Sequence, residues 1–169
     1  MNVGTKSLLF GVHQFLWHPI VVLLAWYRLF GRPTLKDLVC IIVHDWGYMG
    51  SPEMDGSVGT LHPLRSAKFV RWLGKDAEDM VKYHSRRLAN ELGEEPSKLC
   101  LADKLSFVYE IPCFYLFRAR ITGELAEYRR SSERAGFCPL ETSDIEWFHA
   151  LSRRLEDIAT CGKSELSPY

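Results

Sequence analysis

Residues 38–47 read LVCIIVHDWG, an apolar run that ends in the adjacent pair His44 and Asp45. Thr34 can cap a helix ahead of this run, so the sequence predicts a buried helix from Leu35 to about Asp45. An imidazole and a carboxylate at the end of a buried helix need partners, because removing an unpaired charge from water is costly. A metal ion is one such partner.

The rest of the chain shows helical periodicity and helix stop signals almost throughout. Further helices are predicted over Pro19–Phe30, Pro63–Gly74, Asp76–Leu92, Lys98–Glu110, Gly123–Arg134 and Thr142–Thr160. Residues 47–61 contain four glycines and predict a loop. The β-branched clusters are short and fall inside the helical periodicity, so we predict an all-α fold.

Two histidines, His18 and His62, directly precede a proline. Proline pushes the residue before it out of the α region, while proline itself suits the first position of a helix. We therefore expect both imidazoles at helix N-termini, facing a common cavity.

The composition describes an ordinary globular chain of 169 residues, with 47% apolar and 25% charged residues. The 21 basic and 21 acidic side chains cancel and form no basic stripe, which argues against a nucleic-acid partner. The five cysteines are odd in number and lack a CxxC spacing, so we interpret them as reduced thiols of a cytoplasmic protein. Nothing in the composition indicates an oligomeric state.

The segment from Leu8 to Phe30 is apolar and aromatic, which raises the question of a membrane helix. Polar residues and a proline interrupt it, so no continuous run reaches the ~18–20 residues that a transmembrane helix needs. We therefore predict buried helices and no transmembrane segment. Peripheral membrane contact is left open through three aromatic side chains: Trp17, Trp26 and Tyr27.

Six potential metal ligands are spread over the predicted helices and helix ends, each in an apolar setting. They are His18, His44, Asp45, His62, His84 and Asp103. Imidazole and carboxylate together suit Fe, Mn, Zn or Ni better than Ca or a metal selected by thiolates. Six ligands exceed the need of one tetrahedral site, so we predict two metals with one bridging carboxylate. His13 and His149 are interpreted as ordinary core or surface histidines.

The order H…HD…H…H…D resembles the HD-domain superfamily of metal-dependent phosphohydrolases. The interval from His18 to His44 matches a helix, a turn and a second helix. The stretches LHPLRSA (61–67), VKYHS (81–85) and LADKL (101–105) resemble the later ligand motifs of that superfamily. The resemblance covers about residues 15–110, and the two extra histidines resemble its dinuclear branch.

The resemblance implies a ligand set for each metal. His18, His44, Asp45 and Asp103 would hold one ion; Asp45, His62 and His84 would hold the second. It also implies one compact HD-like helical bundle over residues 1–169, with the metal core at about 15–110 and helices at 111–160 covering it. Two divalent ions are expected, Fe or Mn first, with Zn, Ni, Co and Mg also compatible.

Other charged residues are candidates for catalysis or substrate binding. Members of the superfamily often keep an acidic residue near the nucleophilic water, and Glu53 or Asp55 could serve here, although both also fit a solvated loop. Lys104 follows a ligand directly and could reach a phosphate, although it also fits an exposed helix position. Other cations available for phosphate charge are Arg65, Lys68, Arg86, Arg118 and Arg120. Arg86 ranks below Lys104, because on a continuous helix it would lie roughly 200° around the axis from His84.

The expected function is hydrolysis of a small phosphorylated molecule, a nucleotide or a phosphate ester. The segment Trp46-Gly47-Tyr48 replaces the Gly-Lys that is common in signalling phosphodiesterases, which argues against a cyclic dinucleotide. The first alternative is a di-iron oxygenase of the same superfamily that cleaves C–C or C–P bonds with nearly the same ligands. The second is a non-catalytic, metal-binding regulatory module, against which the complete ligand set argues.

Overall fold

The helix that precedes the His44–Asp45 pair begins where the sequence predicts. In this computed structural model, which describes residues 1–54 and 56–161, helix α3 spans Leu35–Val43. The Thr34 hydroxyl accepts a hydrogen bond from the Asp37 amide at 3.2 Å, and the Asp37 carboxylate accepts one from the Thr34 amide at 2.8 Å. This reciprocal capping box satisfies two backbone donors at the start of the helix. The helix ends at Val43, so the His44–Asp45 pair lies just beyond it.

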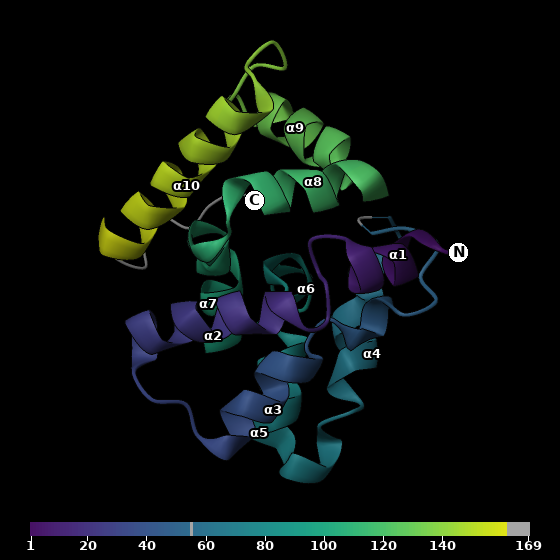
Figure 1. Ribbon diagram of the computed structural model, residues 1–169. Helices are drawn as coiled ribbons and strands as arrows, with labels where there is room; N and C mark the ends of the chain where they lie inside the picture. Colours follow the sequence, from purple (N-terminus) through teal and green to yellow (C-terminus); the bar gives the residue numbers. More distant parts are fainter. Residues whose placement is uncertain (55, 162–169) are drawn as a thin grey trace.

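Over the described ranges the chain forms helices and no strands, which confirms the all-α prediction (Figure 1). The α-helices are α1 (Val3–Phe10), α2 (Trp17–Phe30), α3, α4 (His62–Ala67), α5 (Lys75–Lys82), α6 (Arg86–Glu91), α7 (Lys98–Ser106), α8 (Pro112–Thr122), α9 (Glu124–Arg134) and α10 (Asp144–Cys161). Single 3-10 turns are η1 (Trp46–Tyr48), η2 (Gly59–Leu61), η3 (Arg71–Leu73) and η4 (Phe107–Tyr109).

Within the described residues, most buried apolar side chains form two large hydrophobic cores, and Leu8, Tyr48 and Met54 form a small third cluster. The first lies among α2, α3, α5 and α7, where α2 packs along α7 and α3 against α5. Its fully buried members include Val22, Ile41, Val81 and Leu99. These helices place their polar ends around one common point, which is where the candidate ligands lie.

The second core joins the C-terminal helices α8, α9 and α10, with Tyr115, Trp147 and Phe148 at its centre. Gly123 has φ +85°, a left-handed conformation that lets the chain turn directly from α8 into α9. Helix α10 also packs against η4 and α7. The C-terminal helices therefore lie over one side of the first core (Figure 1).

The predicted helix over Asp76–Leu92 is in fact two helices. Helix α5 ends at Lys82, and the Ser85 hydroxyl accepts a hydrogen bond from the Leu88 amide at 3.4 Å to start α6. Serine competes with the helical backbone through such local hydrogen bonds, and here it begins a new helix. His84 therefore lies in the break between the two helices, not inside one.

The prediction that proline would displace the residue before it from the α region is wrong for His62. This residue has φ −55° and ψ −36°, a helical conformation, and begins α4. The predicted position of both histidines at helix N-termini is confirmed, because His18 and His62 lie in the first turn of α2 and α4. Helix α4 is also shorter than predicted and ends at Ala67.

Among the described residues, no helix has the length and apolar character needed to cross a membrane. The expected aromatic contact with a membrane surface is wrong for Trp26, which is 3% exposed and belongs to the first core. Trp17 is half-buried and donates its indole N–H to Glu110 at 2.9 Å. Of the three aromatic residues, Tyr27 alone is exposed.

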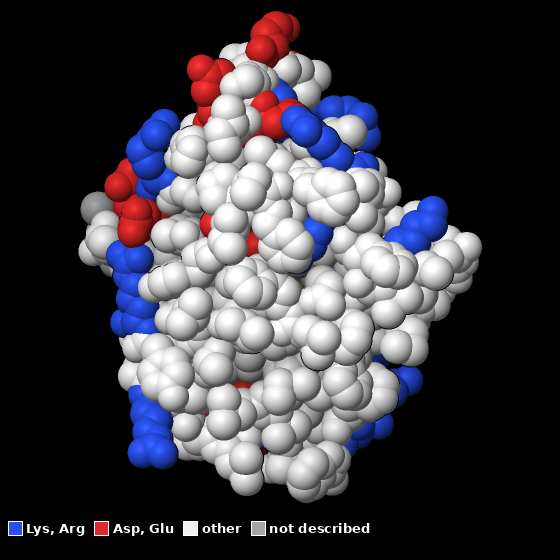
Figure 2. Space-filling view, viewed as in Figure 1, with Lys and Arg blue, Asp and Glu red and all other residues white. Residues whose placement is uncertain are grey.

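Helix α2 is apolar on its exposed side as well as on its buried side. Ile20, Leu24 and Tyr27 are each exposed to about half of their surface. Figure 2 shows that much of this face of the molecule is uncharged, with Lys, Arg, Asp and Glu side chains mainly along its edges. This double apolar character explains why the segment resembles a membrane helix in sequence.

Candidate metal centre

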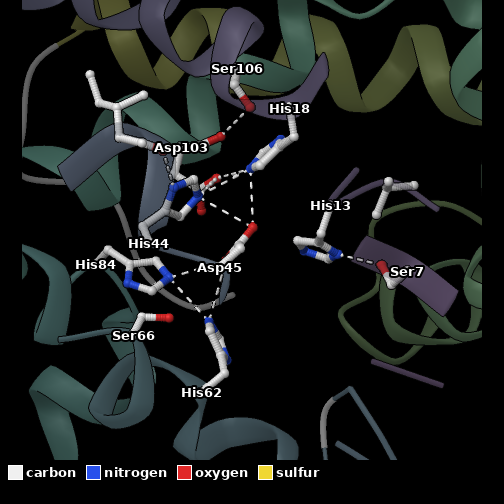
Figure 3. Close-up of polar contacts among 12 residues, drawn as sticks. Ser7, His13, His18, His44, Asp45, His62, Ser66, His84, Asp103 and Ser106 are labelled. Atoms are coloured by element: carbon white, nitrogen blue, oxygen red, sulfur yellow. Dashed lines mark hydrogen bonds and ion pairs between the residues drawn. The ribbon is translucent and has the colours of Figure 1, made fainter. Parts of the chain in front are cut away.

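Six side chains from five separate segments converge at the polar ends of the first core (Figure 3). They are His18 from α2, His44 and Asp45 after α3, His62 from α4, His84 from the break between α5 and α6, and Asp103 from α7. We call this set the ligand cluster. Five of the six are buried, and Asp103 is half-buried. The structure thus brings together all six residues that the sequence singled out as metal ligands.

Three of the imidazoles are held by the same local contact. The Nδ1 atoms of His44, His62 and His84 lie 2.7, 2.9 and 2.6 Å from the carbonyl oxygens of Ile41, Gly59 and Val81, each three residues earlier. A carbonyl only accepts hydrogen bonds, so each Nδ1 carries the proton and a neutral ring has its lone pair on Nε2. Backbone contacts of this kind fix the tautomer of metal-binding histidines.

Asp45 lies between two pairs of histidines. Its Oδ2 atom is 3.4 Å from His18 Nε2 and 3.3 Å from His44 Nε2. Its Oδ1 atom is 3.6 Å from His62 Nε2 and 3.5 Å from His84 Nε2. One carboxylate thus presents one oxygen to each pair, which is the geometry of a bridging ligand.

Asp103 completes the first of these two groups. Its Oδ1 atom lies 3.0 Å from His18 Nε2 and 3.6 Å from His44 Nε2. Ligand atoms on one ion with bonds of ~2.0–2.2 Å lie about 3.0–3.5 Å apart. The spacing in the cluster therefore suits metal coordination.

The cluster is poorly satisfied by its own hydrogen bonds. His62 Nε2 lies 3.1 Å from His84 Nε2, and His18 Nε2 lies 3.2 Å from His44 Nε2. The lone pairs of His62 and His84 repel each other at this distance unless a proton or a cation lies between them. Asp45 Oδ2 is buried and has no hydrogen-bond partner among the described residues. The groups His18–His44–Asp103 and His44–Asp45–His84 could therefore each hold a metal ion.

The carboxylates of the cluster are ionised. Burial alone would raise the pKa of Asp45, but the charges of His44 and His13 outweigh it and hold the pKa well below its usual range. Burial would likewise raise the pKa of Asp103, but hydrogen bonds from His18 and His44 lower it. The cluster thus holds two carboxylate charges, that of Asp45 buried and that of Asp103 half-buried, which favours a bound cation.

The histidines of the cluster differ in charge. Burial, together with the neighbouring His84, lowers the pKa of His62 to about 3, so this ring is neutral and keeps its lone pair. Burial would also lower the pKa of His44, but Asp45 and Asp103 outweigh it and raise the pKa well above its usual value. Asp45 and Asp103 thus favour the protonated form of His44, and a bound metal ion would replace that proton.

The turn after Asp45 supports His62 from two sides. The Tyr48 ring stacks on the His62 ring, with centroids 3.7 Å apart. The Gly47 amide donates to the Ser66 hydroxyl at 2.8 Å, and a Cβ atom at Gly47 would lie 2.0 Å from the His62 carbonyl oxygen. Glycine is therefore required at position 47 for α4 to approach the turn.

His13 is the residue beside the centre that the sequence did not reveal. Its Nδ1 lies 2.9 Å from the Ser7 hydroxyl and 3.3 Å from Glu124 Oε1, and its ring centroid lies 5.6 Å from that of His18. The opposite edge of the ring is turned toward Asp45 and His18 (Figure 3). Glu124 is 111 positions away in the chain, so no local pattern could have predicted this pair.

Three other predicted site residues are not brought to the ligand cluster. The Glu53 carboxylate accepts a hydrogen bond from the Val58 amide at 2.8 Å and so folds back on its own loop. Arg65 donates to the Val58 carbonyl at 2.9 Å, and Lys68 is exposed. Asp55 lies outside the described residues.

Lys104 and Arg86 line a cavity of about 290 Å³ together with His18 and Asp103. Arg86 was ranked below Lys104 on the premise of a continuous helix through His84, and that premise is wrong because the helix breaks there. Burial and the nearby Arg86 lower the pKa of Lys104. Both cations are therefore placed beside the first group of ligands.

The two other arginines considered for phosphate binding have structural partners. Arg118 is buried and forms an ion pair with the equally buried Glu110 at 2.6 Å. Arg120 pairs with Asp144 at 2.5 Å on the surface. Neither of them lines the cavity.

No protein-family model, curated protein or solved structure matches this chain. Its function must therefore be inferred from its own side chains.

Proposed function

We propose that this protein is a metal-dependent phosphohydrolase that acts on a small phosphorylated molecule through two divalent metal ions. The observation that carries the proposal is the placement of Asp45, whose two oxygens face two different pairs of histidine Nε2 atoms. A carboxylate with this environment is suited to bridging two ions. The resemblance of the ligand order to the HD-domain superfamily supports the same conclusion.

Each ion has a ligand set in this proposal. His18, His44, Asp45 and Asp103 hold the first; Asp45, His62 and His84 hold the second. Nitrogen and carboxylate donors favour Fe or Mn, and Zn, Ni, Co and Mg are also compatible with such a set. Two divalent ions at such a centre supply an acidified water for attack at phosphorus and neutralise charge on the phosphoryl oxygens.

The residues around the ligand cluster have roles of their own. Lys104 and Arg86 line the cavity beside His18 and Asp103, so both can bind the remaining negative charge of a phosphate. His13 is held by Glu124 and can offer the opposite edge of its ring to a phosphoryl oxygen or to water. Tyr48 keeps the His62 ring in place by stacking.

The pair of cations favours a substrate with a phosphate or phosphonate group, because such a group needs neutralising charges beside the metals, and so argues against an oxygenase that cleaves C–C bonds. Both alternatives, the di-iron oxygenase and the regulatory module, remain outcomes of the same experiment.

The test begins with protein purified without oxygen and then loaded with Mn or with Fe. Metal content, phosphate release from a panel of phosphoesters and oxygen consumption are measured on the same samples. We expect up to two ions per chain and phosphate release from the Mn form without oxygen. Activity of the iron form alone, with consumption of oxygen, would establish the oxygenase instead. Metal binding without turnover of any ester in either form would support the alternative of a non-catalytic regulatory module.

A further inference from the structure

The cavity beside the ligand cluster has two walls of opposite character. One wall carries His18, Asp103, Lys104 and Arg86. The other is built by η4 and the C-terminal helices from Phe107, Tyr115, Trp147, Leu151, Leu155 and Ile158. We call this second set the apolar wall. A molecule that fills the cavity therefore meets charge on one side and hydrocarbon on the other.

Two buried polar side chains beside the apolar wall, Ser132 and Glu110, already have partners within the protein. The Ser132 hydroxyl accepts a hydrogen bond from the Trp147 indole at 2.9 Å. The Glu110 carboxylate accepts hydrogen bonds from Arg118 at 2.6 Å and from Trp17 at 2.9 Å. A sugar placed against this wall would lose its hydration without gaining equivalent hydrogen bonds, which is unfavourable.

The cavity is also small. Its volume of about 290 Å³ lies just below the ~300–1,000 Å³ that small-molecule sites commonly have. This space suits a single phosphate with a body of roughly one or two rings or a short branched chain. It is too small for a dinucleotide.

Building on the proposed function, we propose that the substrate is a phosphate monoester with an apolar body. Its phosphate lies at the ligand cluster between Lys104 and Arg86, and its aromatic or aliphatic body lies against the apolar wall. This narrows the substrate class from any nucleotide or phosphate ester to amphiphilic monoesters. The C-terminal helices then act as the part of the protein that selects the substrate.

The first experiment measures binding without turnover. Alkylphosphonates from methyl to hexyl, which cannot be hydrolysed, are titrated into the Mn-loaded protein by calorimetry, with inorganic phosphate and a hydroxylated phosphonate as references. Burial of each additional methylene should improve affinity by up to about fourfold until the cavity is full. Quenching of tryptophan fluorescence by naphthylmethylphosphonate gives a second readout, because Trp147 belongs to the apolar wall.

Three variants and one control locate the effect. Leu155→Asn should flatten the dependence on chain length while inorganic phosphate still binds, and Leu151→Phe should shorten the longest chain that fits. Lys104→Met should instead weaken all members of the series by a similar factor. Leu92→Asn is the matched control, because Leu92 is 49% exposed and does not line the cavity. Circular dichroism verifies folding, and Leu151→Phe keeps the test decisive if Leu155→Asn does not fold.

The outcomes separate this inference from the proposed function. Equal affinity for all chain lengths, or tighter binding of the hydroxylated phosphonate, would overturn the apolar substrate class even if some phosphoester is hydrolysed. Failure to hydrolyse any ester would overturn the proposed function, while the gradient in phosphonate binding would still be measurable.

Discussion

The ligand cluster and the apolar wall lie on two sides of one cavity, but the side chains around them are held by different kinds of contact. In the cluster, three histidines are oriented by the carbonyl three residues before each of them. In the C-terminal helices, polar groups are satisfied by distant partners, such as Glu124 with His13 and Arg118 with the Gly11 carbonyl. The orientation of these three imidazoles thus depends on short segments, whereas the shape of the cavity depends on how the C-terminal helices pack.

The sharpest test of this difference removes Asp45, the proposed bridging carboxylate. Asp45→Ala should abolish metal binding and activity together, because the two pairs of histidines would lose the charge that joins them. Metal analysis and the phosphoester assay measure the effect. His149→Ala, at an exposed position, should leave both unchanged. Full metal content in the Asp45 variant would contradict the bridging role.

The C-terminal helices can be weakened without touching the ligands. Glu110→Gln should lower the free energy of unfolding by about 3–5 kcal/mol, because it leaves the buried Arg118 without its counter-charge. Urea denaturation measures this loss. The control Arg87→Gln breaks an exposed pair with Glu91 and should cost less than about 1 kcal/mol. Similar losses of unfolding free energy in both variants would show that the buried Arg118–Glu110 pair stabilises the protein no more than an exposed pair does.

Metal removal tests the stability of the cluster itself. An ion that binds only the native state adds about 2.7 kcal/mol at a hundredfold excess over its Kd. A chelator should therefore lower the melting temperature by about 5–10 °C in a chain of this length. The Asp45→Ala variant is the control, since it should show no shift with the chelator. An unchanged melting curve after verified removal of metal would contradict a structural role for the ions.

The smallest expected effect concerns His13, which joins the two regions. His13→Asn can keep a donor near Glu124 but removes the ring edge that faces Asp45 and His18. We expect unchanged metal content and a decrease in kcat of about tenfold, the loss of roughly one hydrogen bond to a charged group. Loss of metal in this variant would show instead that His13 supports the ligands directly.

The sequence predicted much of the centre because its signals are local. Thr34 and Asp37 begin α3 through a cap that spans four residues, and an apolar run marks its buried side. His18 and His62 lie in the first turn of a helix that contains a proline, as expected from their neighbours. By contrast, the prediction of one helix over Asp76–Leu92 is wrong, because Ser85 caps the start of a new helix.

By itself, the sequence determined the all-α fold and the positions of several helices, since these follow from neighbouring residues, but it did not predict α1 or α8. The six candidate ligands followed from their order along the chain and their apolar surroundings. Only the tertiary structure decided that Trp26 is buried, that His13 lies beside the centre and that Arg86 reaches the cavity. Asp103 meets His18 across 85 positions of chain, and Glu124 meets Ser7 across 117. Contacts of this range depend on how the helices pack, because no local backbone preference extends so far along the chain.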